Sequence, residues 1–192
     1  MLSTFNLLIY LCRKTNMNNT IINSTSHELY AEFHSVYTTS FPIFEQRTDT
    51  QQEEAFADSR YHLIAYTDDS SEFVGFIGCW EFDTYCYIEH FAIAAARRGR
   101  GEGSRILRCF IASAKQEGKT VILEIDPPVD DISISRQHFY ERLGMVVNEF
   151  DHNHPPYREG FNPHPLRIMS ANEKISHKLY CQFVEDLNKV VM

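Results

Sequence analysis

The sequence predicts a single mixed α/β domain, in which helices cover both faces of a mixed β-sheet. Its 192 residues are the usual length of one domain. Hydrophobic residues make up 43% of the chain, which is ample material for a core. Strand-like segments come first as a meander, and a strand–helix–strand alternation follows, which is the order expected of such a sandwich.

The first half of the chain reads as three antiparallel strands preceded by two helices. Thr25 and Glu28 have capping-box spacing, as do Thr50 and Glu53, so a helix is expected to start at each threonine. Residues 68–71 form a polar turn between two apolar, strand-like runs. The expected elements are a short strand at 20–23, helices from Thr25 to Phe41 and from Thr50, and strands at 61–66, 73–82 and 85–93.

The second half alternates helices with short strands. Val121 to Ile125 is almost wholly apolar, as in a strand that is buried on both faces. Gly144 predicts the end of the helix before it. The expected elements are helices at 101–116, 133–143 and 173–190, and strands at 121–125, 145–147 and 166–169.

Charge and cysteine content exclude several classes of protein. The net charge of −8 opposes a general electrostatic hold on nucleic acid or on an anionic membrane, and mildly favours cationic substrates. The five cysteines are odd in number, scattered, and contain no CxxC pair, so neither a disulfide framework nor a zinc ribbon is indicated. This balance predicts a cytoplasmic protein.

The N-terminal apolar run, Phe5 to Cys12, is too short to span a membrane, and its positive charges follow it instead of preceding it as in a secretory signal. We expect residues 1–18 to be a non-functional extension, with Met17 as an alternative start. Residues 19–192 then form the single domain.

The chemistry concentrates where the strand at 85–93 runs into a glycine- and arginine-rich turn. Gly99, Gly101 and Gly103 let the backbone N–H groups converge at the start of the next helix, and Arg97, Arg98 and Arg100 add positive charge, which together predict a pyrophosphate cradle. The alternative is a tight turn with solvated arginines.

Two nucleotide motifs fit this turn poorly. A P-loop requires a lysine that is absent here. Gly99-x-Gly101-x-x-Ser104, with Glu124 about 20 residues further on, nearly fits a dinucleotide fingerprint. However, the five residues 94–98 are too many for its tight turn, so dinucleotide binding is the third interpretation.

Two segments carry a family resemblance. Phe91-Ala92-Ile93, followed by Arg98-x-x-Gly101-x-Gly103, resembles the acetyl-coenzyme A signature of the GCN5-related N-acetyltransferase (GNAT) superfamily. Residues 139–145 resemble its FY-x-x-x-GF segment, with Met145 in place of the usual Phe. The match in order and spacing runs from about residue 20 to 170. The loop Pro155-Pro156-Tyr157 resembles that of a bacterial subset known by sequence and not by a substrate.

The resemblance implies the GNAT fold, in which the fourth and fifth strands splay and the pantetheine arm of acetyl-CoA lies between them. It implies acetyl-CoA as co-substrate, no metal, an amine acceptor, and either a monomer or a homodimer. The residues expected to bind the coenzyme are Phe91, Ala92, Ile93, Arg98, Gly99, Arg100, Gly101, Glu102, Gly103 and Ser104.

The resemblance also suggests catalytic residues. Tyr140 occupies the slot where many members place a general acid for the departing thiolate; the alternative is a core tyrosine beside Phe139. Glu89 is the first candidate for the base, since period-2 alternation places it with Tyr87, Phe91 and Ile93 on one face, where partial burial would raise its pKa. The alternative for Glu89 is pairing with an Arg or Lys. His90, expected on the opposite face, and Glu124 are the second and third candidates for the base.

His152, His154 and His164 raise the question of a metal site, but they lack a fixed spacing and an acidic partner pattern, so we expect a solvated or acceptor-binding loop. Cys86 and Cys109 read as buried, which disfavours an acyl-enzyme. The sequence therefore predicts an acetyl-CoA-dependent N-acetyltransferase that acts on a primary amine of a small molecule or peptide by direct transfer. The alternative is a non-catalytic acyl-CoA-binding sensor.

Overall fold

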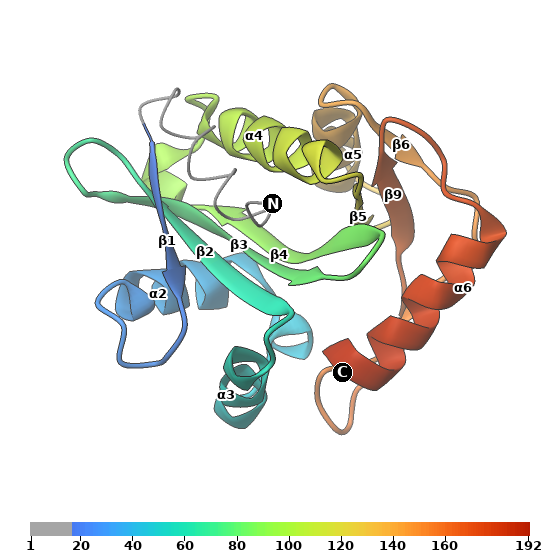
Figure 1. The fold of residues 1–192 in the computed structure, drawn as a ribbon, viewed down its shortest axis with the longest axis horizontal. Coiled ribbons are helices and arrows are strands. Elements are labelled where there is room, and N and C mark those ends of the chain that lie inside the picture. Colours follow the sequence, from blue (N-terminus) through green and yellow to red (C-terminus); the bar gives the residue numbers. More distant parts are fainter. Residues whose placement is uncertain (1–16) are drawn as a thin grey trace. The chain divides into compact units, whose positions relative to one another are not determined.

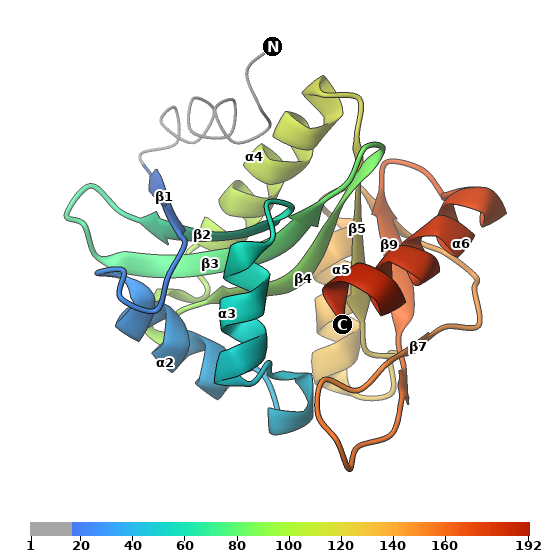
Figure 2. The same cartoon turned by 60° about the horizontal axis from the view of Figure 1, so that its bottom comes forward.

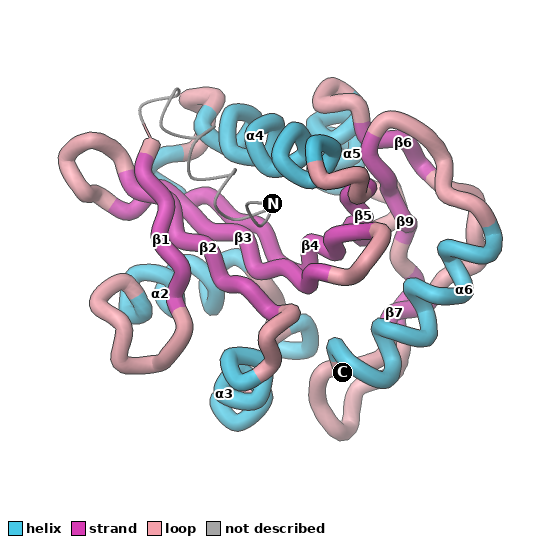
Figure 3. Tube along the Cα trace, in the orientation of Figure 1, coloured by secondary structure: helices cyan, strands magenta, loops and turns pink. Residues whose placement is uncertain are grey.

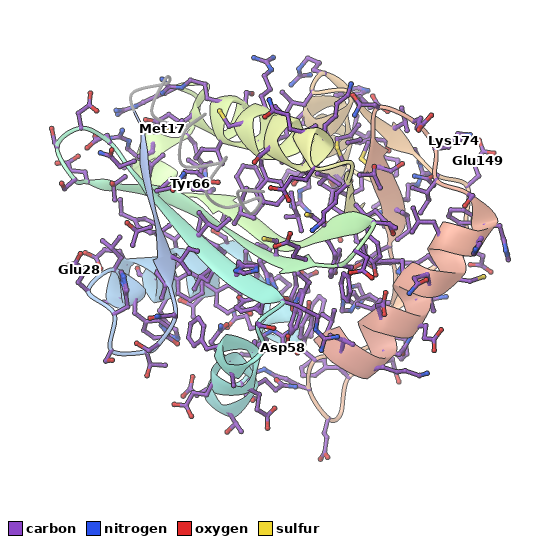
Figure 4. All side chains as sticks on the ribbon, viewed as in Figure 1. Met17, Glu28, Asp58, Tyr66, Glu149 and Lys174 are labelled. Atoms are coloured by element: carbon purple, nitrogen blue, oxygen red, sulfur yellow. The ribbon has the colours of Figure 1, made fainter. Side chains whose placement is uncertain are left out.

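The computed structural model describes residues 17–192, so residues 1–16 of the extension predicted at 1–18 lie outside the described part of the chain. The chain divides after Val121 into two compact units, which are described separately. Met17, the alternative start, is 2% exposed, and the residue after it begins a strand. Figure 4 labels Met17 and shows the side chains of the described residues.

The first unit is built on an antiparallel meander. Its strands are β1 (Asn18–Ile22), β2 (Tyr61–Thr67), β3 (Phe73–Glu81) and β4 (Tyr85–Ile93), hydrogen-bonded in that order (Figure 1). β2, β3 and β4 confirm the strands predicted at 61–66, 73–82 and 85–93. β1 starts two residues earlier than expected, paired along its whole length with β2.

Helices cover both faces of this meander. α2 (Tyr30–Ser40) and α3 (Asp49–Ala57) lie on one face, and α4 (Glu102–Gln116) lies on the other (Figures 1 and 2). Two 3-10 turns complete the unit, η1 (Ile43–Glu45) and η2 (Ala95–Arg97). The rings of Phe33 and Phe76 meet edge to face at 4.7 Å, which fixes α2 on β3.

Both predicted helix starts are wrong by a few residues. α2 begins at Tyr30 with no side-chain cap, because the chain from Thr25 forms turns in which the Leu29 N–H donates to His27 Nδ1. α3 begins at Asp49, and its capping box is formed by Thr48 and Gln51. A Gln at the third helical position satisfies the box as well as a Glu does, which is why the Thr–Glu spacing misled.

The second unit contains the end of β5 (Thr120–Ile125), which crosses the boundary, and the antiparallel strands β9 (Arg167–Ala171) and β6 (Met145–Val147) in the order β5-β9-β6. A small separate pair is formed by β7 (Asn153–His154) and β8 (His164–Pro165). Figure 3 shows these strands in magenta between the helical segments in cyan.

The helices of this unit are α5 (Asp131–Glu141), α6 (His177–Asp186) and the π-helical turn η3 (Leu187–Val191). Gly144, at φ +84°, ends the α5 segment as predicted. The last helix starts four residues later than expected, because Ser176 caps it by accepting from the Leu179 N–H. Among the described residues, no helix is long and apolar enough to cross a membrane.

Candidate functional site

The glycine-rich turn of the first unit has the backbone conformation that the sequence predicts. Gly99 and Gly101 have φ of +78° and +77°, which L-residues rarely adopt. Gly101 is the N-cap of α4 and offers no side chain to cap it. The first N–H groups of a 15-residue helix are therefore uncapped by a side chain, and they carry the positive end of its dipole. Such a helix start suits a phosphate group.

The start of α4 packs tightly against the end of β4. A Cβ atom placed on Gly103 would lie 3.2 Å from Ile93 Cγ1 and 3.5 Å from Phe91 Cζ. Glycine at 103 thus allows the helix to approach the strand, and Phe91 and Ile93 point to the α4 face of the sheet. The predicted coenzyme segments, 91–93 and 98–104, lie together in the first unit.

Two of the three arginines of the turn are bound within the protein. Arg97 donates to Glu102 at 2.6 Å and to Asp68 at 2.8 Å, and its hydrogen bond lowers the pKa of the Asp68 carboxyl. Arg98 donates from Nε to the Ile93 carbonyl oxygen at 3.0 Å. Arg97 is thus neutralised by two carboxylates, whereas the predicted positive charge of the turn is carried by the exposed Arg98 and Arg100. Arg100 is exposed.

A β-bulge interrupts β4 just before the coenzyme segment. Gly78 of β3 is opposite His90, but the next residue, Cys79, is opposite Ile88, so Glu89 is the extra residue. One inserted residue inverts the alternation of side chains that follow it. Phe91 and Ile93 therefore lie on the face opposite to Glu89, and the predicted shared face is wrong.

Glu89 instead joins a buried cluster on the α2/α3 face. Arg47 pairs with its Oε1 at 2.7 Å, and Trp80 Nε1 donates to its Oε2 at 2.9 Å. The exposed fractions of the Arg47 and Glu89 side chains are 5% and 0%. The structure thus shows the alternative that the sequence left open, a carboxylate paired with an arginine.

His90, the second candidate for the base, lies on the same face as Glu89 because of the bulge. Its Nε2 is 2.9 Å from the carbonyl oxygen of Glu45, an acceptor, so this nitrogen carries the proton. The rings of Tyr37 and Phe41 stand edge-on to it at 4.9 and 4.7 Å. His90 is 5% exposed, so it is a buried imidazole with a fixed orientation.

Tyr140 belongs to the second unit. It is 8% exposed, and burial raises its pKa to about 12, an effect that Arg136 partly opposes. Its ring meets that of Phe139 at 5.2 Å in an edge-on arrangement. A phenol that stays protonated at neutral pH can donate a proton, which is the state that a general acid requires.

Of the two alternatives for the histidine loop, the structure contradicts the solvated one, while acceptor binding stays a prediction. His152 and His154 are 4% and 2% exposed, and both face the carboxylate of Glu124. His152 Nε2 bonds to Oε1 of Glu124, and His154 Nε2 lies 3.6 Å from Oε2. Glu124 is thus the acidic partner that the sequence spacing does not show, since it precedes these histidines by 28 and 30 residues.

The other ring nitrogens of these histidines are held as well. His152 Nδ1 is 3.2 Å from the Tyr180 hydroxyl, and His154 Nδ1 is 2.5 Å from the carbonyl oxygen of Pro155. Tyr157, in the Pro-Pro-Tyr loop, stacks on His154 at 5.0 Å. Within residues 17–192, no group of His, Cys, Asp and Glu is arranged to hold a metal ion.

The cysteines of β3 and β4 are unreactive by environment. Cys79 and Cys86 are both 1% exposed. Burial raises the pKa of the Cys79 thiol, and that of Cys86 to about 12, so neither forms a thiolate readily at neutral pH. Cys109, on α4, is partly exposed, contrary to the prediction that it is buried.

Comparison with known proteins identifies the fold. A structure from Bacteroides thetaiotaomicron, assigned to the GNAT acetyltransferases, is 28% identical with a TM-score of 0.80, over 91% of this chain and 97% of its own. Spermidine N-acetyltransferase from Vibrio cholerae, solved with CoA and spermine, is 13% identical with a TM-score of 0.60, over 81% and 95%. Ribosomal-protein-S18-alanine N-acetyltransferase from Escherichia coli is 18% identical with a TM-score of 0.57, over 83% and 97%.

No curated protein matches the sequence. The sequence itself matches the acetyltransferase (GNAT) family over residues 26–145, which is more than half of the chain and includes β4, the glycine turn and α5. The fold prediction is thereby confirmed, as a mixed α/β protein with mostly antiparallel strands flanked by helices. The chain belongs to the GNAT family of acetyltransferases.

Proposed function

We propose that this protein is an acetyl-CoA-dependent N-acetyltransferase that transfers the acetyl group directly to a primary amine of a small molecule or a peptide. The uncapped start of α4 carries the proposal. It combines two glycines at positive φ, a helix N-terminus without a side-chain cap, and close packing on the end of β4. The first N–H groups of such a helix need a partner that its N-cap residue does not supply, and a pyrophosphate would provide one.

The coenzyme would be held mainly by the backbone. The N–H groups of residues 99–104 would bind its pyrophosphate, and the exposed side chain of Arg100 would add positive charge. The N–H of Arg98 already donates to the Ala95 carbonyl oxygen at 3.3 Å, so Arg98 would contribute through its side chain. Residues 91–93 would offer backbone groups at the end of β4 to the pantetheine arm, and one N–H would polarise the thioester carbonyl. This explains why Phe91, Ala92 and Ile93 need no reactive side chains.

In direct transfer, the amine nitrogen bonds to the thioester carbon, the carbon–sulfur bond breaks, the nitrogen loses a proton and the departing sulfur gains one. The proton for sulfur is assigned to the Tyr140 hydroxyl, which burial keeps protonated. Proton transfer by a positioned side chain is typically worth about 10²- to 10⁴-fold in rate.

We do not propose Glu89 as the base that accepts the proton from the amine. One oxygen of that carboxylate is paired with the Arg47 guanidinium and the other accepts from Trp80 Nε1, and both contacts favour its ionised form. A carboxylate in this state is a weak base for an ammonium group. His90 and Glu124 stay predictions for this role.

The acceptor class follows from charge and from the neighbours. A protein of net charge −8 attracts cationic amines. One neighbour is named for acetylating spermidine and another for the alanine of a ribosomal protein, so the fold serves both small and peptide amines. A cytoplasmic location and a monomer or homodimer stay predictions from the sequence.

The test is thermal unfolding with acetyl-CoA, CoA or NADH, followed by a screen of polyamines and peptide amines for turnover. A ligand at 100 times its Kd stabilises by about 2.7 kcal/mol, a shift of several degrees for a chain of this size. Both CoA species should shift the midpoint, and NADH should not. A shift with NADH alone would favour dinucleotide binding. Coenzyme binding without any turnover across the amine screen would favour the acyl-CoA sensor.

A matched pair of variants locates the binding. Gly101→Ala strains the cradle, and Gly118→Ala imposes the same strain at the other end of α4, where φ is +74°. An L-residue at such an angle costs about 1–2 kcal/mol in either place. Both variants should lose similar stability, but only Gly101→Ala should lose the shift with CoA. If CoA shifts the unfolding midpoint of the two variants equally, the glycine turn does not bind the coenzyme.

A further inference from the structure

Arg47 follows η1 in the chain and is far in sequence from the coenzyme segment, yet its side chain contacts the residue that creates the β4 bulge. We propose that Arg47 is a positioning residue for acetyl transfer, which acts through Glu89 to hold the bulge that aims residues 91–93. This inference rests on the proposed function, because it concerns the same strand end.

Arg47 is fixed from three directions. Its backbone N–H donates to the Tyr37 hydroxyl at 2.8 Å, which ties it to α2. Its guanidinium pairs with Glu89 Oε1 at 2.7 Å. The same guanidinium lies over the rings of Trp80 and Tyr61, at 5.4 and 5.9 Å from their centres. A planar cation held in this way presents one orientation to the carboxylate.

Glu89 is fixed in turn from two segments. Arg47 holds one of its oxygens, and Trp80 of β3 holds the other through Nε1 at 2.9 Å. Trp80 is opposite Tyr87 in the β3–β4 register, so this bond spans the bulge from its N-terminal side. The carboxylate of the inserted residue is therefore bound on both sides of the irregularity.

The consequence for residues 91–93 follows from the alternation of a strand. With the bulge, Phe91 and Ile93 face α4 and contact Gly103. Without it, the same side chains would turn to the α2/α3 face, and the backbone groups of 91–93 would rotate with them. A bulge is a local departure from regular pairing, so it persists where surrounding contacts hold it.

Stability alone does not account for this arrangement. A buried ion pair is often no more stabilising than apolar side chains of the same volume. Its strict geometry does, however, specify one conformation of the inserted residue. The Arg47–Glu89 pair is thus suited to fixing the strand end.

The experiment compares Arg47→Met, Arg47→Lys and Glu89→Gln with Arg60→Met as control. Arg60 pairs with Asp58 at 2.5 Å in the same unit, but Arg60 is exposed and Asp58 only half-buried, so its loss tests charge removal near the surface (Figure 4 labels Asp58). Three quantities are measured: amide hydrogen exchange of β4, the Kd of acetyl-CoA, and kcat and KM for a turned-over amine. The pH–rate profile is recorded for each variant.

Arg47→Met and Glu89→Gln should both speed exchange in 86–93. Each should lower kcat/KM for acetyl-CoA by about tenfold or more, since small misplacements of a reacting group have large effects on rate. The KM of the amine and the shape of the pH–rate profile should be unchanged. Arg47→Lys should restore part of the loss, and Arg60→Met should match the wild type.

Several results would overturn the inference. If Arg47→Met leaves exchange in β4 and the kinetics of acetyl-CoA unchanged, Arg47 does not position the strand. If Glu89→Gln abolishes turnover and one limb of the pH profile while Arg47→Met does not, Glu89 is itself the base. Failure of the wild type to bind acetyl-CoA would instead overturn the proposed function, and the exchange data would still report whether Arg47 holds β4.

Discussion

The Nε of Arg98 donates to the carbonyl oxygen of Ile93 at 3.0 Å, and its NH2 group lies 3.2 Å from the Ser40 hydroxyl. The arginine of the coenzyme signature thus closes the end of β4 and reaches the last residue of α2. Its side chain is exposed, yet it is tied to the strand end and to α2 by these two bonds.

Arg98→Met should therefore weaken coenzyme binding through the shape of the turn. The variant loses the charged donor to the Ile93 carbonyl, and a hydrogen bond to a charged group is worth about 1.5–3 kcal/mol. We expect the Kd of acetyl-CoA to rise roughly tenfold, measured by calorimetry.

Arg100→Met is the matched control, since Arg100 is exposed and would act on the pyrophosphate by charge alone. Its effect on Kd should fall with added salt, because a charge that acts through space is screened. Arg98 is exposed as well, so the part of its effect that persists in salt measures the hydrogen bond to the Ile93 carbonyl oxygen. The same salt dependence for both variants would contradict the assigned role of Arg98.

Tyr140→Phe should separate chemistry from binding. The hydroxyl is lost while the buried ring is kept, so the fold and the Kd of acetyl-CoA should change little. If the hydroxyl protonates the departing sulfur, kcat should fall about 10²-fold or more. Phe139→Leu serves as a control for packing, because it alters the ring contact at 5.2 Å and leaves the hydroxyl in place. Unchanged kcat in Tyr140→Phe would make Tyr140 a core residue.

Much of the fold could be predicted because its signals are local. The apolar runs of β2 to β4 and the glycines before α4 depend on neighbours in sequence, and the predicted bounds agree with the structure within a residue or two. The buried cluster around Glu89 could not be predicted in the same way. The single inserted residue Glu89 moves the side chains that follow it in β4 to the opposite faces of the sheet. No local sequence pattern predicts this bulge.

The same limit explains the partners that the sequence missed. Arg47 precedes Glu89 by 42 residues and follows a 3-10 turn, so only the folded chain brings them together. Glu124 and His152 are likewise joined by tertiary folding, across α5 and β6. Neither pair has a fixed sequence spacing that a motif could record.

Glu124→Gln should destabilise the second unit strongly. The carboxylate is buried between two imidazoles, and leaving a buried donor without its carboxylate acceptor costs about 3 kcal/mol. For a chain of this length the unfolding midpoint should fall by roughly 10 °C, measured by calorimetry.

Glu149→Gln is the matched control. Its carboxylate pairs with Lys174 at 3.2 Å on the surface, where both residues are labelled in Figure 4. An exposed pair contributes about 1 kcal/mol or less, so equal losses in both variants would contradict a buried Glu124 cluster.

His164 gives this unit a dependence on acidity with a definite sign. Burial, and to a lesser degree the neighbouring His154, lower its pKa below the ordinary 6.5. The nearby carboxylates of Glu124 and Asp126 oppose this, and His152 adds to it. Because the unfolded chain binds the proton more readily than the folded one, the contribution of His164 to stability is fully present above pH 6.5. It is lost as the pH falls through the folded pKa.

His164→Asn should therefore flatten the decline of unfolding free energy below pH 6.5 in urea titrations, relative to the wild type. His34→Asn, at an exposed position on α2, should leave the slope as it is. If the two variants show the same slope, His164 does not set the acid sensitivity.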